Sequence, residues 1–155
     1  ATAPLIIKQA RELGITAKIM GGDTWENVTI IENAGADAEG IVLSTFFDEA
    51  DPATDEAKKF VPGFKEYLVK NNQPDVIPAV SALGYDAYLA ILTAIKNADS
   101  VDSVAIRDAL VTTEFNGVTG QISFDENGDA VKQLAVIKTV EGGAFKFLQT
   151  VTVAE

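Results

Sequence analysis

The sequence predicts an α/β fold in which helices alternate with short strands, with antiparallel hairpins at the carboxyl end. Two apolar patterns of helical spacing each precede a short apolar run within residues 3 to 45. Three more helical patterns follow between residues 54 and 112. Beyond residue 120, apolar runs are joined by Asn-Gly and Gly-Gly turns, which are typical of hairpins.

Composition removes several function classes. The chain has 155 residues, 47% of them hydrophobic, which is enough for a sizeable core. Its net charge is −11 and its Lys and Arg residues form no dense run, so no nucleic-acid partner or anionic membrane surface is expected. It contains neither Cys nor His, which removes thiol, disulfide and imidazole chemistry. We therefore expect no enzyme, no catalytic residue, no metal site and no cofactor.

The first helix is predicted over residues 3 to 13, because its apolar positions recur at helical spacing. Pro4 suits its first turn and Gly14 suits the position just past its end. A short strand over residues 17 to 20 follows, and two glycines close it.

The next helix is predicted from Trp25 to about residue 33, with Asp23 or Thr24 as its cap. Residues 40 to 45 then form a continuous apolar run, typical of a strand that is buried on both faces of a parallel sheet. Trp25 is expected to pack in the core, with the wall of a ligand pocket as the alternative.

Three longer helices are predicted next, over residues 54 to 71, 81 to 97 and 102 to 112. Thr54 is a candidate cap for the first of them, and Pro62 is expected to kink it or restart it. Its expected core stripe is Phe60, Phe64, Tyr67 and Leu68. The expected stripe of the second helix is Leu83, Ala87, Ala90, Ile91, Ala94 and Ile95.

The last third of the chain reads as hairpins. Asp125, Asn127 and Asp129 imitate the start of a calcium loop, which needs Gly at its sixth position and Glu at its twelfth. Ala130 and Val136 occupy those positions, so a hairpin turn is the better interpretation.

Asp23 is the candidate for chemistry. It follows a strand and two glycines, at the place where open α/β sheets bind charged ligands. Spacing alone slightly favours a helix cap over a ligand contact, and both hold if Thr24 takes the cap. The two glycines match neither a G-x-G-x-x-G loop nor a P-loop, so nucleotide binding is not expected.

Seven stretches resemble, in order, the carboxyl-terminal half of a type I periplasmic binding protein, and specifically the branched-chain amino-acid (Leu/Ile/Val-type) binding proteins of ABC transporters. They are residues 5 to 15 (LIIKQARELGI), 20 to 23 (MGGD), 38 to 42 (AEGIV), 84 to 87 (GYDA), 109 to 110 (AL), 115 to 120 (FNGVTG) and 122 to 129 (ISFDENGD).

The resemblance implies parts of two lobes with open, mostly parallel sheets flanked by helices, and a ligand enclosed between the lobes. Residues 1 to 47 would belong to lobe 2, residues 48 to 128 to lobe 1, and residues 129 to 155 would return to lobe 2. The amino-terminal half of the fold would be absent, so we expect the chain alone to bind amino acids poorly. Exposed sheet edges would favour its homodimerisation.

The resemblance also implies a function. Asp23, with Thr24 beside it, would bind the ammonium group of an amino acid, whereas Ala79 and Val80 would contact the ligand's side chain. The expected role is extracytoplasmic capture of a branched-chain or related amino acid and its delivery to an ABC transporter permease. The alternatives are a ligand-sensing or regulatory domain of the same fold, and an interaction fragment without a ligand.

Overall fold

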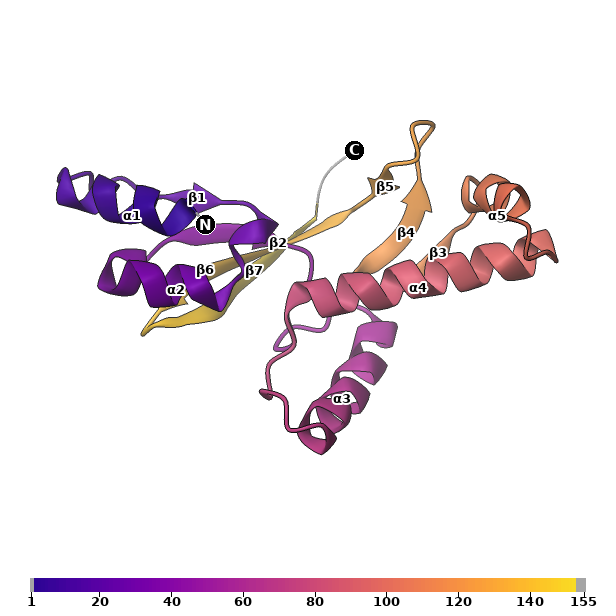
Figure 1. The fold of residues 1–155 in the computed structure, drawn as a ribbon, viewed down its shortest axis with the longest axis horizontal. Helices are drawn as coiled ribbons and strands as arrows, with labels where there is room; N and C mark the ends of the chain where they lie inside the picture. The colour runs from indigo at the N-terminus through magenta and orange to yellow at the C-terminus, as the bar shows by residue number, and fades with distance from the viewer. Residues whose placement is uncertain (1, 153–155) are drawn as a thin grey trace. The chain divides into compact units, whose positions relative to one another are not determined.

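The structure is a computed structural model that describes residues 2–152. The chain divides into two compact units (Figure 1). The first unit combines Ala1–Phe46 with Ala135–Val151, and the second is built around Phe47–Leu134. Residues 130 and 131 pair with β4 and so belong to the second unit, whereas the lobe boundaries implied by the resemblance stay a prediction.

The first unit is a four-stranded sheet with helices. Its elements are α1 (Ala3–Glu12), β1 (Met20–Gly21), the 3₁₀ turn η1 (Asp23–Trp25), α2 (Val28–Ala34), the 3₁₀ turn η2 (Gly35–Ala38), β2 (Val42–Thr45), β6 (Leu134–Glu141) and β7 (Ala144–Thr152). The strand order is β1-β2-β6-β7, with β1 parallel and β6 antiparallel to β2.

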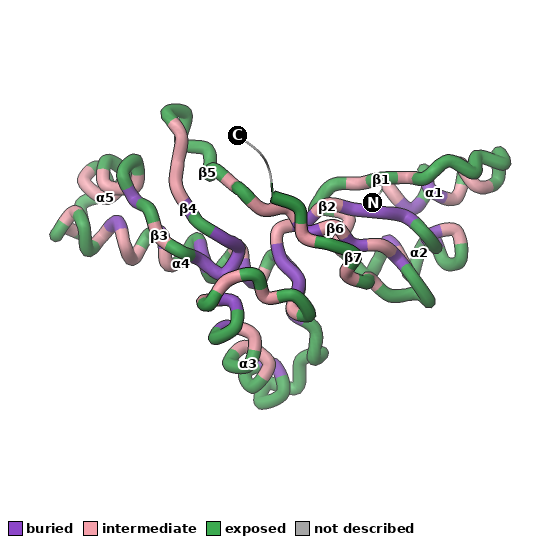
Figure 2. The backbone as a smooth tube through the Cα atoms, turned by 180° about the vertical axis from the view of Figure 1, so that it is seen from behind, coloured by how far each residue is buried: buried purple, intermediate pink, exposed green. Residues whose placement is uncertain are grey.

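The core of this unit lies where α1 and α2 meet residues at the ends of β2 and β6. It comprises Ile7, Ile30, Ala34, Ala38, Ile41 and Val140. The tube coloured by burial shows β2 as largely buried, as its continuous apolar run predicts (Figure 2). The α/β class and the predicted hairpin at the Gly-Gly turn, formed by β6 and β7, are therefore confirmed for this unit.

The second unit contains three helices and a small antiparallel sheet. Its elements are α3 (Asp55–Lys70), α4 (Ala79–Ala98), α5 (Ser103–Leu110), β3 (Phe115–Gly117), β4 (Gly120–Phe124) and β5 (Ala130–Val131). The sheet order is β3-β4-β5. Its core cluster comprises Phe47, Ala57, Phe60, Leu68, Ile77, Ala79, Ala82 and Val118.

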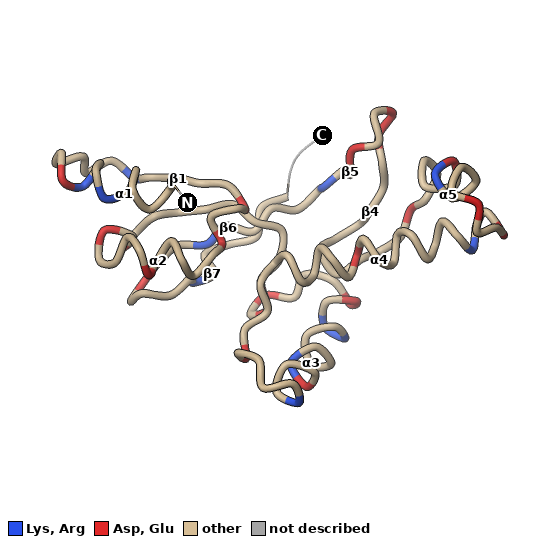
Figure 3. Tube along the Cα trace, viewed as in Figure 1, with Lys and Arg blue, Asp and Glu red and all other residues tan. Residues whose placement is uncertain are grey.

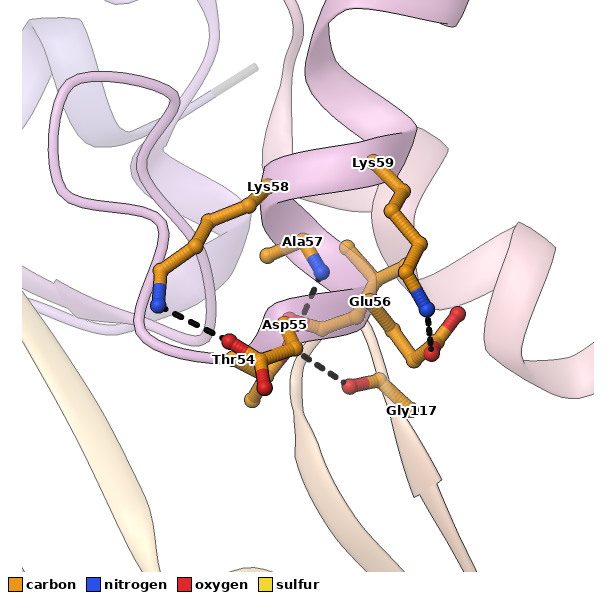
Figure 4. Close-up of polar contacts among 8 residues, drawn as sticks. Thr54, Asp55, Glu56, Ala57, Lys58, Lys59 and Gly117 are labelled. Atoms are coloured by element: carbon orange, nitrogen blue, oxygen red, sulfur yellow. Dashed lines mark hydrogen bonds and ion pairs between the residues drawn. The ribbon is translucent and has the colours of Figure 1, made fainter.

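Two side chains cap helices of the second unit, and of these the Thr54 cap was predicted. The hydroxyl of Thr54 accepts a hydrogen bond from the Ala57 N–H at the start of α3, and it donates one to the Gly117 carbonyl (both 2.9 Å; Figure 4). Asp102 caps α5 in the same way through the N–H groups of Val104 and Ala105. Thr54 therefore joins α3 to β3 as well as starting α3.

Two features of α3 differ from prediction. The helix runs through Pro62 without the predicted restart, and the alternative, a kink, stays a prediction. Tyr67 is 58% exposed, whereas Phe60 and Leu68 are buried. The helical period alone could not tell which edge of the apolar stripe faces the core.

Helix α4 begins at Ala79, two residues before its predicted start, and its buried face is rotated from the predicted one. The buried positions are Ala79, Ala82, Asp86, Ala90 and Ala94, whereas Ile91 is 49% exposed. Small side chains allow the neighbouring elements to approach closely. Among residues 2–152, α4 is the one helix that is long and apolar enough to cross a membrane, but its buried aspartate is hydrogen-bonded to the turn between β3 and β4.

Charged side chains are spread along the chain. The trace coloured by charge shows Lys and Arg scattered over α1, α3, α5 and the strands, interspersed with acidic residues (Figure 3). Three of the ion pairs are exposed and join neighbours within one helix, Asp55–Lys58, Glu56–Lys59 and Arg107–Asp108. Such pairs contribute little stability.

Candidate ligand-binding site

The carboxylate of Asp23 lies on an exposed turn at the carboxyl end of β1. The chain leaves β1 through Gly22 and forms η1, in which the Trp25 N–H donates to the Gly22 carbonyl (3.0 Å) and the Glu26 N–H to the Asp23 carbonyl (2.9 Å). Asp23 and Thr24 are both exposed on this turn. Within residues 2–152, neither side chain has a hydrogen-bonding or ion-pair partner, which leaves the carboxylate open to a ligand.

Neither Asp23 nor Thr24 caps the following helix. Asn27 is the cap, and its side-chain oxygen accepts a hydrogen bond from the Thr29 N–H (2.9 Å). The predicted cap was wrong because η1 intervenes, so that α2 begins at Val28 rather than at Trp25. The competing explanation for Asp23, a structural cap, is thereby removed.

Trp25 packs against the backbone of β1. A Cβ atom on Gly21 would lie 2.2 Å from Cδ2 of the indole, so any side chain at position 21 would displace the ring. The ring is half-buried and packs on the core of the first unit, as predicted. Gly21 therefore serves close packing rather than a phosphate loop.

A polar hollow of about 270 Å³ lies beside this turn within the first unit. Thr24, Trp25 and Asn27 are among its lining residues, as are Thr2 and Asn33. All of its lining side chains are uncharged. Asp23 itself is outside the lining, so the hollow is a neighbour of the carboxylate and not its binding pocket.

Glu26, at the end of the same turn, is held by two buried partners. Its Oε1 lies 2.5 Å from the Nζ of Lys138, and the side chains are 10% and 5% exposed, respectively. Its Oε2 accepts a hydrogen bond from the Thr45 hydroxyl (2.7 Å). The pair thus links the Asp23 turn to β2 and β6.

Lys138 occupies the most buried row of the sheet. In the β2–β6 register, Leu43 faces Lys138 and Thr45 faces Val136, so these four side chains share one face. All four residues are buried. Sequence reasoning missed this lysine, although it interrupts an alternating apolar row on β6 and that interruption was a usable signal.

The other two predicted site residues lie in the second unit. Ala79 and Val80 form the first turn of α4, after the cap residue Pro78. The Ala79 side chain is 3% exposed and packs in the core cluster, whereas Val80 is 69% exposed. Of the two side chains, only that of Val80 is open to a ligand.

Asp86 is a second polar residue that sequence reasoning did not single out. Its carboxylate accepts hydrogen bonds from the N–H groups of Val118 (2.7 Å) and Thr119 (2.8 Å) and from the Thr119 hydroxyl (2.7 Å). The Thr119 hydroxyl also accepts one from Lys132 Nζ (2.6 Å). Burial lowers the pKa of Lys132, and the negative charge of Asp86 partly offsets this effect.

An aromatic hollow of about 500 Å³ lies between α3 and α4, away from the predicted residues of the second unit. Its rings are packed on one another, with centroids 5.0 Å apart for both Phe60–Phe64 and Phe60–Tyr85. Tyr67 is part of its lining. Its two charged lining residues, Glu56 and Lys59, form an ion pair with each other, and we assign the hollow no ligand.

The chain matches the sequence profile described as periplasmic binding protein over residues 1–144. It is 32% identical over 127 residues to the leucine-, isoleucine-, valine-, threonine- and alanine-binding protein of Pseudomonas aeruginosa, covering 81% of this chain and 32% of that protein.

Solved structures are similar over nearly the whole chain. The leucine-binding protein LivK of Thermotoga maritima has a TM-score of 0.83 and 38% identity, covering 97% of this chain and 41% of that one. The substrate-binding protein LivJ of a branched-chain amino-acid transporter from Streptococcus pneumoniae, solved with isoleucine, has a TM-score of 0.75 and 32% identity with the same coverage. This chain spans between 32% and 41% of the length of these relatives.

Proposed function

The chain belongs to the periplasmic binding protein family, and from this membership we propose that it is part of an extracytoplasmic protein that captures an amino acid for an ABC importer. The proposed ligand is a branched-chain or related amino acid. The relatives support it, since their names describe proteins that bind leucine, isoleucine and valine. They are solute-binding proteins, which supports a role in binding rather than catalysis.

The open carboxylate of Asp23 carries the proposal. This carboxylate is exposed, caps no helix and lies at the carboxyl end of a strand. It therefore suits a cationic ligand group. An ammonium group would form a charge-assisted hydrogen bond with it, stronger than a bond between neutral groups. Thr24 would add a hydroxyl next to that contact.

Ala79 and Val80 remain proposed contacts for the ligand's apolar side chain. The exposure of Val80 favours its side chain for this role. Ala79 would contribute only through its backbone, because its methyl group packs in the core. The permease of an ABC transporter is the proposed partner, and homodimerisation through exposed strand edges is proposed for the chain alone.

Ligand titration followed by ¹H–¹⁵N NMR tests this function, because it detects weak binding by the chain. Three probes separate the ligand groups: leucine, 3-methylbutylamine, which keeps only the ammonium, and 4-methyl-2-oxopentanoate, which keeps only the carboxylate. We expect the first two to shift the amide resonances of Gly22, Asp23 and Thr24. The oxo acid should leave them unchanged, because it has no group for the Asp23 carboxylate.

The variant Asp23→Asn removes the charge and keeps the shape. The amide carries no negative charge for the ammonium group, so the ammonium-dependent shifts should disappear. Glu32→Gln, an exposed acidic position on α2, is the matched control with the same loss of charge. Equal responses of wild type and Asp23→Asn to 3-methylbutylamine would contradict the assignment of Asp23.

A further inference from the structure

The buried ion pair between Glu26 and Lys138 is the feature that the proposed function does not use. Glu26 follows the Asp23 turn directly, whereas Lys138 comes from β6, 112 positions later in the chain. Their contact therefore joins the turn to a strand far away in sequence. Thr45 completes the link at the end of β2.

Apolar packing alone does not explain a lysine at this position. The neighbours of Lys138 on its face of the sheet are Leu43, Val136 and Val140, which are buried and apolar. An apolar residue there would pack on them without the cost of removing a charge from water. What the lysine adds is a directional contact with one carboxylate, which best fits a role in fixing geometry.

The contact constrains the backbone that carries Asp23. Glu26 is anchored through both carboxylate oxygens, one to Lys138 and one to Thr45. Its own N–H donates to the Asp23 carbonyl, so the anchored residue also closes η1. The other side of the turn is held by the Trp25 indole against Gly21. Asp23 and Thr24 lie between these two anchors.

We propose that Lys138 is a positioning residue for the Asp23 turn: through its buried contact with Glu26 it fixes η1 in the conformation that presents the Asp23 carboxylate to a ligand ammonium. The pair also neutralises the negative charge of Glu26 within the fold. Asp23 is then the carboxylate of this turn that faces outward. That the turn presents Asp23 to a ligand ammonium rests on the proposed function. That Lys138 fixes the backbone of η1 does not.

The test measures the turn and the ligand response separately. In Lys138→Met we expect the amide resonances of Gly22, Asp23 and Thr24 to move, and the fluorescence of Trp25, the chain's single tryptophan, to shift to the red. Lys138→Arg, which keeps the charge, should restore both signals toward the wild type. Lys58→Met, which breaks the exposed pair with Asp55, should leave both signals unchanged.

The double variant Glu26→Leu/Lys138→Met guards against failure to fold, because it leaves no unpaired buried charge. The proposal expects a folded protein whose 22–24 amides are still displaced and whose shifts with 3-methylbutylamine are lost. Wild-type resonances for residues 22–24 in this folded double variant would overturn the positioning role and leave the pair with a role in stability alone. If the 22–24 amides are displaced in the double variant but the wild type shows no response to 3-methylbutylamine, the positioning role is supported and the proposed function is contradicted.

Discussion

The carboxylate of Asp86 accepts two hydrogen bonds from Thr119 alone, one from its N–H (2.8 Å) and one from its hydroxyl (2.7 Å). A third comes from the Val118 N–H. Asp86 lies on the buried face of α4, and Thr119 lies in the tight turn between β3 and β4. One side chain thus fixes the helix to the turn of the β3–β4 hairpin.

Asp86→Asn should destabilise the second unit. An amide presents one acceptor oxygen where the carboxylate presents two, so at least one buried donor of the turn loses its partner. Leaving a buried donor unsatisfied costs about 1 to 3 kcal/mol. Urea unfolding followed by circular dichroism measures the change, and Glu66→Gln, an exposed position on α3, should change the midpoint little.

Gly117→Ala should also destabilise this unit, whereas Gly84→Ala should not. A Cβ at position 117 would lie 2.6 Å from the Oδ1 of Asp86, and overpacking of this kind typically costs about 1 to 3 kcal/mol. A Cβ at position 84 meets nothing within 4 Å, and alanine is favoured over glycine in a helix by about 1 kcal/mol. Thermal unfolding of the two variants should shift in opposite directions, and a loss of stability from both would contradict this prediction.

Lys138→Met should destabilise the first unit by about 3 to 5 kcal/mol, because it leaves the carboxylate of Glu26 buried without its cation. The double variant Glu26→Leu/Lys138→Met should recover most of this loss, since no charge remains to be desolvated. Urea unfolding of the wild type, the variants Glu26→Leu and Lys138→Met, and the double variant gives the coupling energy. A coupling energy near zero would show that the contact contributes nothing to stability.

The turn between β4 and β5 should weaken in acid. The Asp129 N–H, followed by that of Asn127, donates to the Asp125 carboxylate and lowers its pKa below the ordinary 3.8. Because the folded pKa lies below the unfolded one, the stabilisation is complete above the unfolded pKa and is lost as pH falls through the folded value.

Carboxyl-selective NMR titration of Asp125 should therefore show a midpoint below 3.8. Asp125→Asn keeps an acceptor oxygen and removes the ionisation, so its turn resonances should stay constant over the same pH range. A midpoint at or above the ordinary value would contradict the hydrogen-bonding arrangement.

Much of the fold was predictable, because it depends on local patterns. The β2 run, the Thr54 cap and the turn at Asp125 were all identified from neighbouring residues, and all are present in the structure. The errors occurred where the start of a helix or its buried face depends on contacts with residues distant in sequence. The face of α4 that is buried depends on its packing partners, and the helical period does not reveal them.

The candidate site divides in the same way. The position of Asp23 after a strand and two glycines was legible in sequence, as was its resemblance to an amine-binding residue. The sequence did not reveal that Asp23 caps no helix, because η1 moves the start of α2 to Val28 and makes Asn27 the cap. Likewise, Ala79 and Val80 are neighbours in sequence, yet the packing of α4 buries the first and exposes the second.

By itself, the sequence determined the α/β class and the family, and it supplied Asp23 as the proposed contact for an amine. Helical period, apolar runs, turn residues and short motifs are all encoded within a few positions of one another. Only the tertiary structure decided that Lys138 holds Glu26 and that Asp86 holds the Val118–Thr119 turn. Each of these contacts joins groups that are distant in sequence, and buried charges meet only after the strands and helices have brought them together.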